Sequence, residues 1–229
     1  NFRLIGSIDY EQWDRRWQPT FVGHRARTDE ISYRAEIRRN LADTLTGSIA
    51  YIHSNRFGSP FISTTTATGD PYFNLIAPFN LADRNRDKVR VSLNWEPVEP
   101  LSLQVVVDES FDNYGHRGGS NLGLRNGSAR NYSLDAAYTF SENMQAVAWF
   151  SRNETHIDQA SRNWSPADNS REIWSANLGN IGTSFGADIN GKPTEKIEVG
   201  ASLSQSFITD QFKQKTSDPE TYSVPNIST

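Results

Sequence analysis

The chain has 229 residues, of which 36% are hydrophobic and none is cysteine, and its formal net charge is −4. Without cysteine, these residues form no disulfide, thiolate metal site, catalytic thiol or covalent c-type haem attachment, and the scattered basic residues do not favour nucleic-acid binding. No apolar run approaches the roughly 18 residues that a membrane helix needs, whereas a transmembrane β-barrel needs only every second residue to be apolar.

The first 54 residues contain three stretches in which apolar and polar residues alternate, which predicts three strands with one apolar and one polar face. Their apolar positions are Phe2, Leu4, Ile8 and Tyr10, then Ile31, Tyr33, Ala35 and Ile37, then Leu45, Ile49 and Tyr51. Residues 18–28 are expected to form a loop and residues 40–44 a short corner. Residues 54–88 lack sustained alternation and are expected to form a second, long loop.

Residues 88–114 show the clearest pattern in the chain. Apolar residues alternate with polar ones up to Trp95, a corner follows between Pro97 and Pro100, and the alternation then resumes from Leu101. A period of two on both sides of a tight corner predicts an antiparallel hairpin. Its polar face and aromatic ends are typical of a transmembrane barrel, and parity places Glu109 on the apolar side, near the outer rim or displaced by a bulge.

The remainder of the chain repeats this organisation. Residues 113–130, 152–179 and 211–229 are expected to form loops. Two strands lie between the first two of these loops, with apolar positions at Tyr132, Leu134, Ala136, Tyr138 and Phe140, then at Met144, Ala146, Ala148 and Phe150. Two more follow residue 179, joined by a corner at residues 190–193, with apolar positions from Ile181 to Ile189 and from Ile197 to Phe207.

Short corners and long loops therefore alternate along the chain, as do the periplasmic turns and extracellular loops of outer-membrane barrels. Residues 101–111 span about 33 Å of strand, which a tilt of about 40° projects onto about 25 Å of membrane. The predicted fold is all-β: an antiparallel transmembrane β-barrel with about nine strands present here. Residues 1–229 are expected to be a single β-barrel segment, incomplete at both ends and part of a larger barrel.

Three segments resemble the MtrB/PioB family of decahaem-associated outer-membrane barrels. They are FNLADRNRDKVRVSLNWEP at residues 79–97, followed by Leu101-Ser-Leu, then YSLDAAYTFSEN at residues 132–143, and KIEVGASL at residues 196–203. The block LADRNRD, which leads into a strand ending in WEP, is the most specific of these features. The resemblance covers most of the chain from about residue 30 and corresponds to the C-terminal part of the barrel.

The resemblance implies a non-enzymatic protein of the bacterial outer membrane. Such a barrel sheaths and positions a periplasmic decahaem c-type cytochrome for electron transfer across the membrane, and an extracellular multihaem cytochrome is a further partner at the loops. The haem c would be carried by the partner cytochrome rather than by this chain. The resemblance identifies no catalytic residue.

Candidate site residues are few. The four histidines are expected at loops or strand ends, without the paired spacing of metal ligands: His24, His53, His116 and His156. Asp108 and Glu109 point to opposite faces of a strand and cannot act as an acid–base pair, while Asp83 and Asp87 flank arginines in a rim charge network. Five N-x-S/T sequons are attributed to composition: Asn126, Asn131, Asn153, Asn163 and Asn226.

The most interesting set is a row of charged residues on the polar faces, proposed as lumen-facing contacts to a partner: Arg34, Glu36, Arg38, Arg90, Asp108 and Asp135. The same row is equally compatible with a hydrated barrel interior. Two other functions therefore remain open, a general outer-membrane porin or solute channel and a soluble all-β binding protein.

Overall fold

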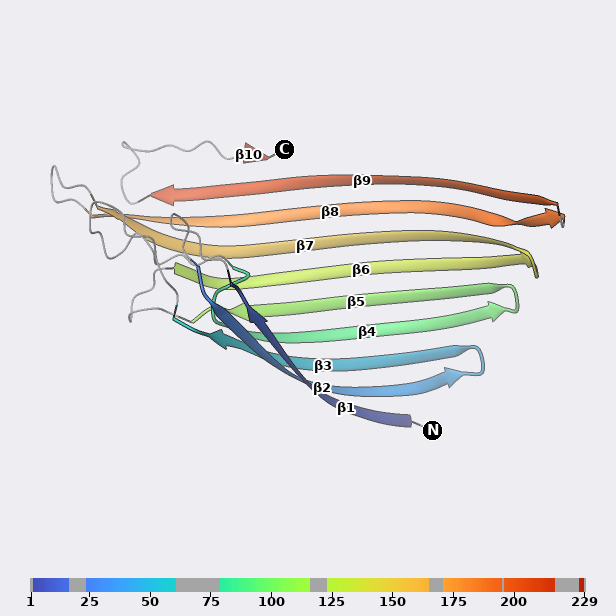
Figure 1. Ribbon diagram of the computed structural model, residues 1–229, viewed down its shortest axis with the longest axis horizontal. Coiled ribbons are helices and arrows are strands. Elements are labelled where there is room, and N and C mark those ends of the chain that lie inside the picture. Colours follow the sequence, from blue (N-terminus) through green and yellow to red (C-terminus); the bar gives the residue numbers. More distant parts are fainter. Residues whose placement is uncertain are drawn as a thin grey trace.

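The computed structural model describes residues 2–16, 24–60, 79–115, 123–164, 171–194, 196–216 and 227–228. These residues form one antiparallel sheet in which each strand pairs with its neighbours in sequence (Figure 1). The strands are β1 (Phe2–Asp14), β2 (Arg27–Ala42), β3 (Leu45–Gly58), β4 (Arg84–Val98), β5 (Leu101–Asn113), β6 (Gly123–Ser141), β7 (Met144–Trp164), β8 (Arg171–Thr194), β9 (Ile197–Thr216) and β10 (Ile227–Ser228). The predicted all-β antiparallel fold is confirmed. In this part of the chain, no helix is long and apolar enough to cross a membrane.

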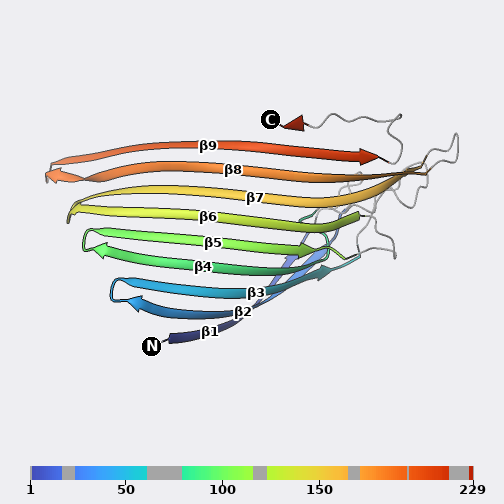
Figure 2. The same ribbon diagram turned by 180° about the vertical axis from the view of Figure 1, so that it is seen from behind.

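The connections are sorted by length as the sequence predicts. Two residues separate β2 from β3, β4 from β5, β6 from β7 and β8 from β9, whereas 12, 25, 9 and 6 residues separate the strands of the intervening pairs. All the two-residue connections lie at one end of the sheet, and the view from behind shows the same order (Figures 1 and 2).

Backbone hydrogen bonds tie adjacent hairpins together at this short-turn end. The amides of Glu96, Thr139 and Lys192 donate to carbonyls of the neighbouring hairpins at 2.8 Å each. In the β4–β5 hairpin, the ladder shifts register between Trp95 and Val98, next to the turn. Proline cannot donate to a ladder, so the irregularity accommodates Pro97 where the strand ends.

Several strands extend further than the alternation of apolar residues predicts. Residues 152–179 were expected to form a loop, yet β7 continues to Trp164 and β8 begins at Arg171. Likewise, β3 continues to Gly58, β4 begins at Arg84, β6 begins at Gly123 and β8 continues to Thr194. These extensions carry polar residues on both faces, so no period of two marks them. They form because the ladder with the neighbouring strand continues residue by residue, as in the 21 pairs between β7 and β8.

The last segment also differs from expectation. Residues 211–229 were predicted to be a loop, but β9 runs to Thr216 and residues 227–228 pair back onto it, with Ile227 opposite Phe212. The sheet therefore has nine long strands, as predicted, and a two-residue tenth, with β1 and β10 at its edges. The buried apolar cluster of Ala82, Tyr114 and Leu124, with Ile157 packed against it, lies at the end opposite the short turns.

Candidate functional site: the two faces of the sheet

The register of the strands assigns every described strand residue to one of two faces, because directly paired residues in an antiparallel sheet point the same way. One row can be followed across all nine long strands. It runs through Ile5, Glu36, Ala50, Arg90, Asp108, Asn131, Asn153, Gly182 and Ile208. The face that contains this row is called the polar face, and the opposite one the apolar face.

The structure places all six predicted contact residues on the polar face. Glu36, Arg90 and Asp108 belong to the row just described, and Arg34 and Arg38 flank Glu36 on β2. Asp135 lies opposite Gln104, four residues along β5 from Asp108. Their shared orientation is therefore established, whereas contact with a partner stays a prediction.

Two acidic members of this set, Glu36 and Asp108, lie beside basic side chains. Glu36 accepts hydrogen bonds from Arg34 and Arg38, and the Arg38 Nη2–Glu36 Oε1 distance is 3.0 Å. Asp108 lies 3.4 Å from the Lys88 Nζ atom and 3.7 Å from the Arg90 Nε atom. Each carboxylate thus has two cationic neighbours.

A denser ion-pair network lies on the polar face where the strands approach the long connections. Arg56 and Arg84 each lie 2.7 Å from the Glu30 carboxylate. Arg86 donates two hydrogen bonds to Asp112, at 2.6 and 2.7 Å. These three ion pairs bind β2, β3, β4 and β5 together, since paired charges satisfy each other when they leave water.

The segment before β4 is held by a separate ion pair, and the predicted rim network of Asp83 and Asp87 with Arg84 and Arg86 is wrong, because both arginines pair with other carboxylates. Arg25 lies 2.7 Å from Asp83 and also donates to the carbonyl of Leu81. Next to Asp112, burial raises the pKa of the Tyr114 phenol to about 12, and the Asp112 carboxylate adds to that rise. Asp87, by contrast, points to the apolar face, where it accepts hydrogen bonds from Tyr51 and His53.

The apolar face is hydrophobic over the part of each strand nearest the short turns. Its exposed side chains include Leu4, Ile37, Ile49, Val91, Leu134, Phe150, Phe185 and Leu203. Aromatic pairs occur on it too: the rings of Tyr138 and Phe140 are 4.9 Å apart, and those of Phe185 and Phe207 are 6.3 Å apart. Exposed apolar surface of this extent is unfavourable in water and typical of a surface that faces lipid.

Charged residues appear on the apolar face only beyond this hydrophobic band, in the described strands β4–β7. Glu109 lies there and pairs with Arg130 at 2.7 Å, and Arg152 pairs with Glu154 at 2.7 Å. The prediction that Glu109 lies toward the outer rim on the apolar side is therefore confirmed, and no bulge displaces it. Neutralising pairs lower the cost of charge at the edge of a membrane.

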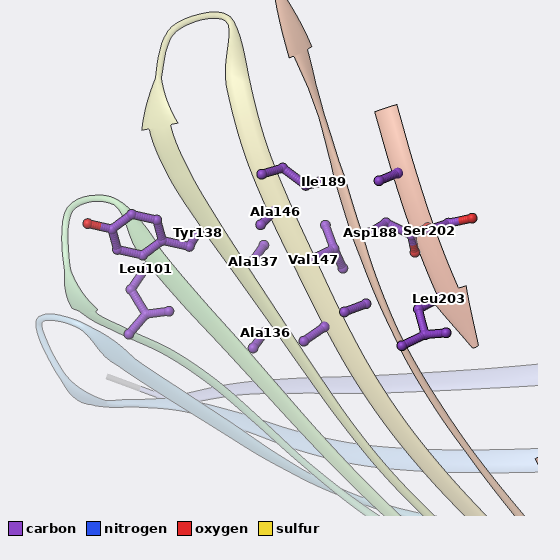
Figure 3. A pocket seen from close by; sticks show the side chains of 13 residues that line it. Leu101, Ala136, Ala137, Tyr138, Ala146, Val147, Asp188, Ile189, Ser202 and Leu203 are labelled. Carbon is purple, nitrogen blue, oxygen red and sulfur yellow. The ribbon is translucent and has the colours of Figure 1, made fainter. Parts of the chain in front are cut away.

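Small residues make a shallow groove on the apolar face near the short turns (Figure 3). The groove has a volume of about 400 Å³, and its walls include Leu101, Tyr138 and Leu203. The groove forms because the short side chains of Ala136, Ala148 and Ala187 follow one another in a single row across β6, β7 and β8, between the larger side chains of the walls. The groove adds apolar surface to the band and contains no cluster of polar groups.

Sequence reasoning missed the large apolar residues on the polar face. Trp149 shares this face with Asp135, and its indole lies over Gly186, where an added Cβ would come within 2.8 Å of the ring. Ile208 shares the face with Gly182 and is 66% exposed. The signal was present, because Val147 and Trp149 break the apolar parity of their strand.

The histidines that the structure describes lie apart from one another. His53 and His156 were expected in loops or at strand ends, but they lie within β3 and β7, and both point to the apolar face. His53 lies 2.9 Å from Asp87, and His116 is outside the described residues. Among the residues that the structure describes, no three His, Asp or Glu side chains are arranged to hold a metal ion.

Comparison with known proteins agrees with this geometry. The sequence model of the family described as outer membrane beta-barrel porin, MtrB/PioB, matches residues 1–229. The outer membrane protein MtrB of Shewanella baltica (strain OS185) is 24% identical over 148 residues, which are 65% of this chain and 20% of that relative. The chain thus spans about a fifth of the relative's length. An amphipathic sheet with a lipid-compatible face and a family match over its whole length together show that the chain belongs to the MtrB/PioB family of porin-like outer-membrane β-barrels.

Proposed function

We propose that this chain is part of a non-enzymatic barrel wall that sheaths a periplasmic multihaem c-type cytochrome and positions it for electron transfer across the outer membrane. Family membership makes the protein an outer-membrane barrel, which removes the soluble alternative. In such a barrel the polar face would line the lumen, because the opposite face must meet lipid. The proposed role as a sheath for a cytochrome combines the family resemblance with one observation on the lumen-facing wall.

That observation is the combination of ion pairs with large apolar side chains on one wall, the half-buried Trp149 and the exposed Ile208. A channel that conducts water and solutes gains nothing from turning Trp149 and Ile208 toward its lumen, because exposed apolar surface is unfavourable in water. A folded protein in the lumen would cover both, and aromatic residues are common anchors in protein–protein contacts. These features support a packed occupant over an open pore.

The composition of the chain indicates which protein of such a complex would carry the haem. None of the 229 residues is cysteine, so the covalently attached haem would belong to the partner and not to this segment. The wall would exclude water and lipid from the partner and hold it at a constant depth. Its apolar face would meet the bilayer.

The test is to purify the full-length barrel from cells that make abundant c-type cytochromes. We expect it to retain a protein with c-type haem absorbance. We also expect the assembled complex to pass far fewer ions across a planar bilayer than the barrel stripped of its partner. A colourless barrel that conducts ions freely as isolated would contradict the proposed sheath function and support a porin function in its place.

A further inference from the structure

We propose that the lumen-facing wall formed by β2–β5 binds an acidic face of the protein that occupies the barrel. This inference rests on the proposed function and extends it, because it states the chemistry of the surface that the occupant turns toward these four strands. It rests on two features of this wall: the cations are more exposed to the lumen than the anions that they pair with, and the charges are unevenly distributed among the strands.

The charges on β2 lie in two layers. The side chain of Glu36 is only 3% exposed, whereas those of Arg34 and Arg38, which both bind it, are 33% and 50% exposed. The carboxylate lies close to the backbone, and the guanidinium groups cover it on the lumen side. An occupant approaching this strand meets the cations first.

The same order recurs on β4 and β5. The Asp108 side chain is 12% exposed, while its neighbours Lys88 and Arg90 are 28% and 39% exposed. Asp112 is 6% exposed beneath Arg86, which is 30% exposed. At Glu36, Asp108 and Asp112 the anions therefore form an underlayer that positions the cations, and the surface presented to the lumen at these three sites is positive although each anion is paired.

The charges are also unevenly distributed across the sheet. On β4, four successive lumen-facing positions are all basic: Arg84, Arg86, Lys88 and Arg90. On β6, β8 and β9, the same face carries the acidic residues Asp135, Asp188 and Asp210. A wall that is positive on one side and acidic on the other favours a single rotational orientation of its occupant, since complementary charge fixes register more than it adds affinity.

Two arginines allow this wall to be tested without removing its underlayer. Arg38 is the more exposed of the two cations beside Glu36, and Arg90 is the more exposed of the two beside Asp108. After Arg38→Gln and Arg90→Gln, Glu36 keeps Arg34 as a neighbour and Asp108 keeps Lys88. The matched control is Arg130→Gln with Arg152→Gln, two arginines on the apolar face that are 48% and 42% exposed. Both double variants remove two positive charges from the full-length protein.

The first measurement is the retention of the haem protein on the immobilised full-length barrel as the salt concentration rises. Exposed pairs are weak individually, so we expect the Arg38→Gln/Arg90→Gln barrel to bind about 2- to 30-fold more weakly and to release its partner at lower salt. The control variant should match the wild type. Equal release from all three barrels would overturn the inference while leaving the sheath intact.

The second measurement does not depend on the partner. Poly-L-glutamate and poly-L-lysine are added separately to the empty full-length barrel in a planar bilayer. We expect poly-L-glutamate to reduce the current at lower concentration than poly-L-lysine, and the Arg38→Gln/Arg90→Gln variant to lose this preference. A wild-type barrel without that preference would refute the positive wall. A barrel that shows it but retains no haem protein would refute the sheath alone.

Discussion

Leu134 and Asp135 provide a direct test of which face meets the membrane, because adjacent residues of β6 point to opposite faces at the same depth. Leu134 is 43% exposed on the apolar face and lies between Val105 of β5 and Phe150 of β7. Asp135 lies between Gln104 and Trp149 on the lumen side. We expect Leu134→Arg to impair assembly in the membrane and Asp135→Asn to leave it nearly unchanged.

The size of the effect follows from the depth of this position. Leu134 lies six residues from Phe140 at the short-turn end of the same apolar column. Six residues span about 20 Å of strand, which a tilt near 40° converts to about 15 Å of depth, near the middle of a band about 25 Å tall. Arginine on the lipid face at that depth costs about 2–4 kcal/mol, which corresponds to a 30- to 700-fold change in the folding equilibrium.

The assay is urea unfolding of the full-length barrel in lipid vesicles, followed by its shift in electrophoretic mobility on heating, together with its abundance in isolated outer membranes. The Leu134→Arg protein should unfold at lower urea and accumulate less in the membrane, while Asp135→Asn should follow the wild type. If the two variants assemble equally well, or if Asp135→Asn is the more damaging, the assignment of the faces is wrong.

Three further predictions follow from the described contacts. Glu36→Gln removes the charge that two arginines share and should lower the free energy of unfolding by about 1–3 kcal/mol. Glu109→Gln changes an exposed pair and should lower it by at most about 1 kcal/mol. A larger loss of stability from Glu109→Gln than from Glu36→Gln in urea titrations would contradict this ranking. Gly186→Ala places a methyl group against the ring of Trp149, so it should shift the tryptophan fluorescence and lower the free energy of unfolding by about 1–3 kcal/mol. Gly182→Ala, with open space around the added methyl group, should change neither property. Identical fluorescence spectra for the two variants would show that the ring does not lie over residue 186. The pKa of the Tyr114 phenol is about 12 in the folded protein and 10 in the unfolded chain, so the stability gained by keeping it neutral is complete below pH 10 and lost as the pH rises toward 12. The Tyr114→Phe protein should therefore lose less stability than the wild type between pH 10 and pH 12. Parallel profiles of stability against pH for the two proteins would refute the assignment.

The features that the sequence alone determined are those that each strand carries by itself. A side chain's face depends on parity, so Glu109 on the apolar side and Asp108 on the lumen side could be assigned from residues 101–111 without knowing any neighbour. The same local pattern located all nine long strands and the end of the sheet that holds the short turns. It works where the barrel crosses the membrane, because there one face must be apolar.

Only the tertiary structure decided where the strands end and which side chains meet. Between residues 152 and 179 the sequence carries no sustained period of two, and only the continuing ladder between β7 and β8 extends the strands. The ion pair of Arg84 with Glu30 joins residues 54 positions apart, and the contact of Trp149 with position 186 depends on strand register. Register and pairing are properties of two strands at once, and they determine which charges are buried beneath others. The positive surface of the lumen wall therefore became visible only when the strands were assembled.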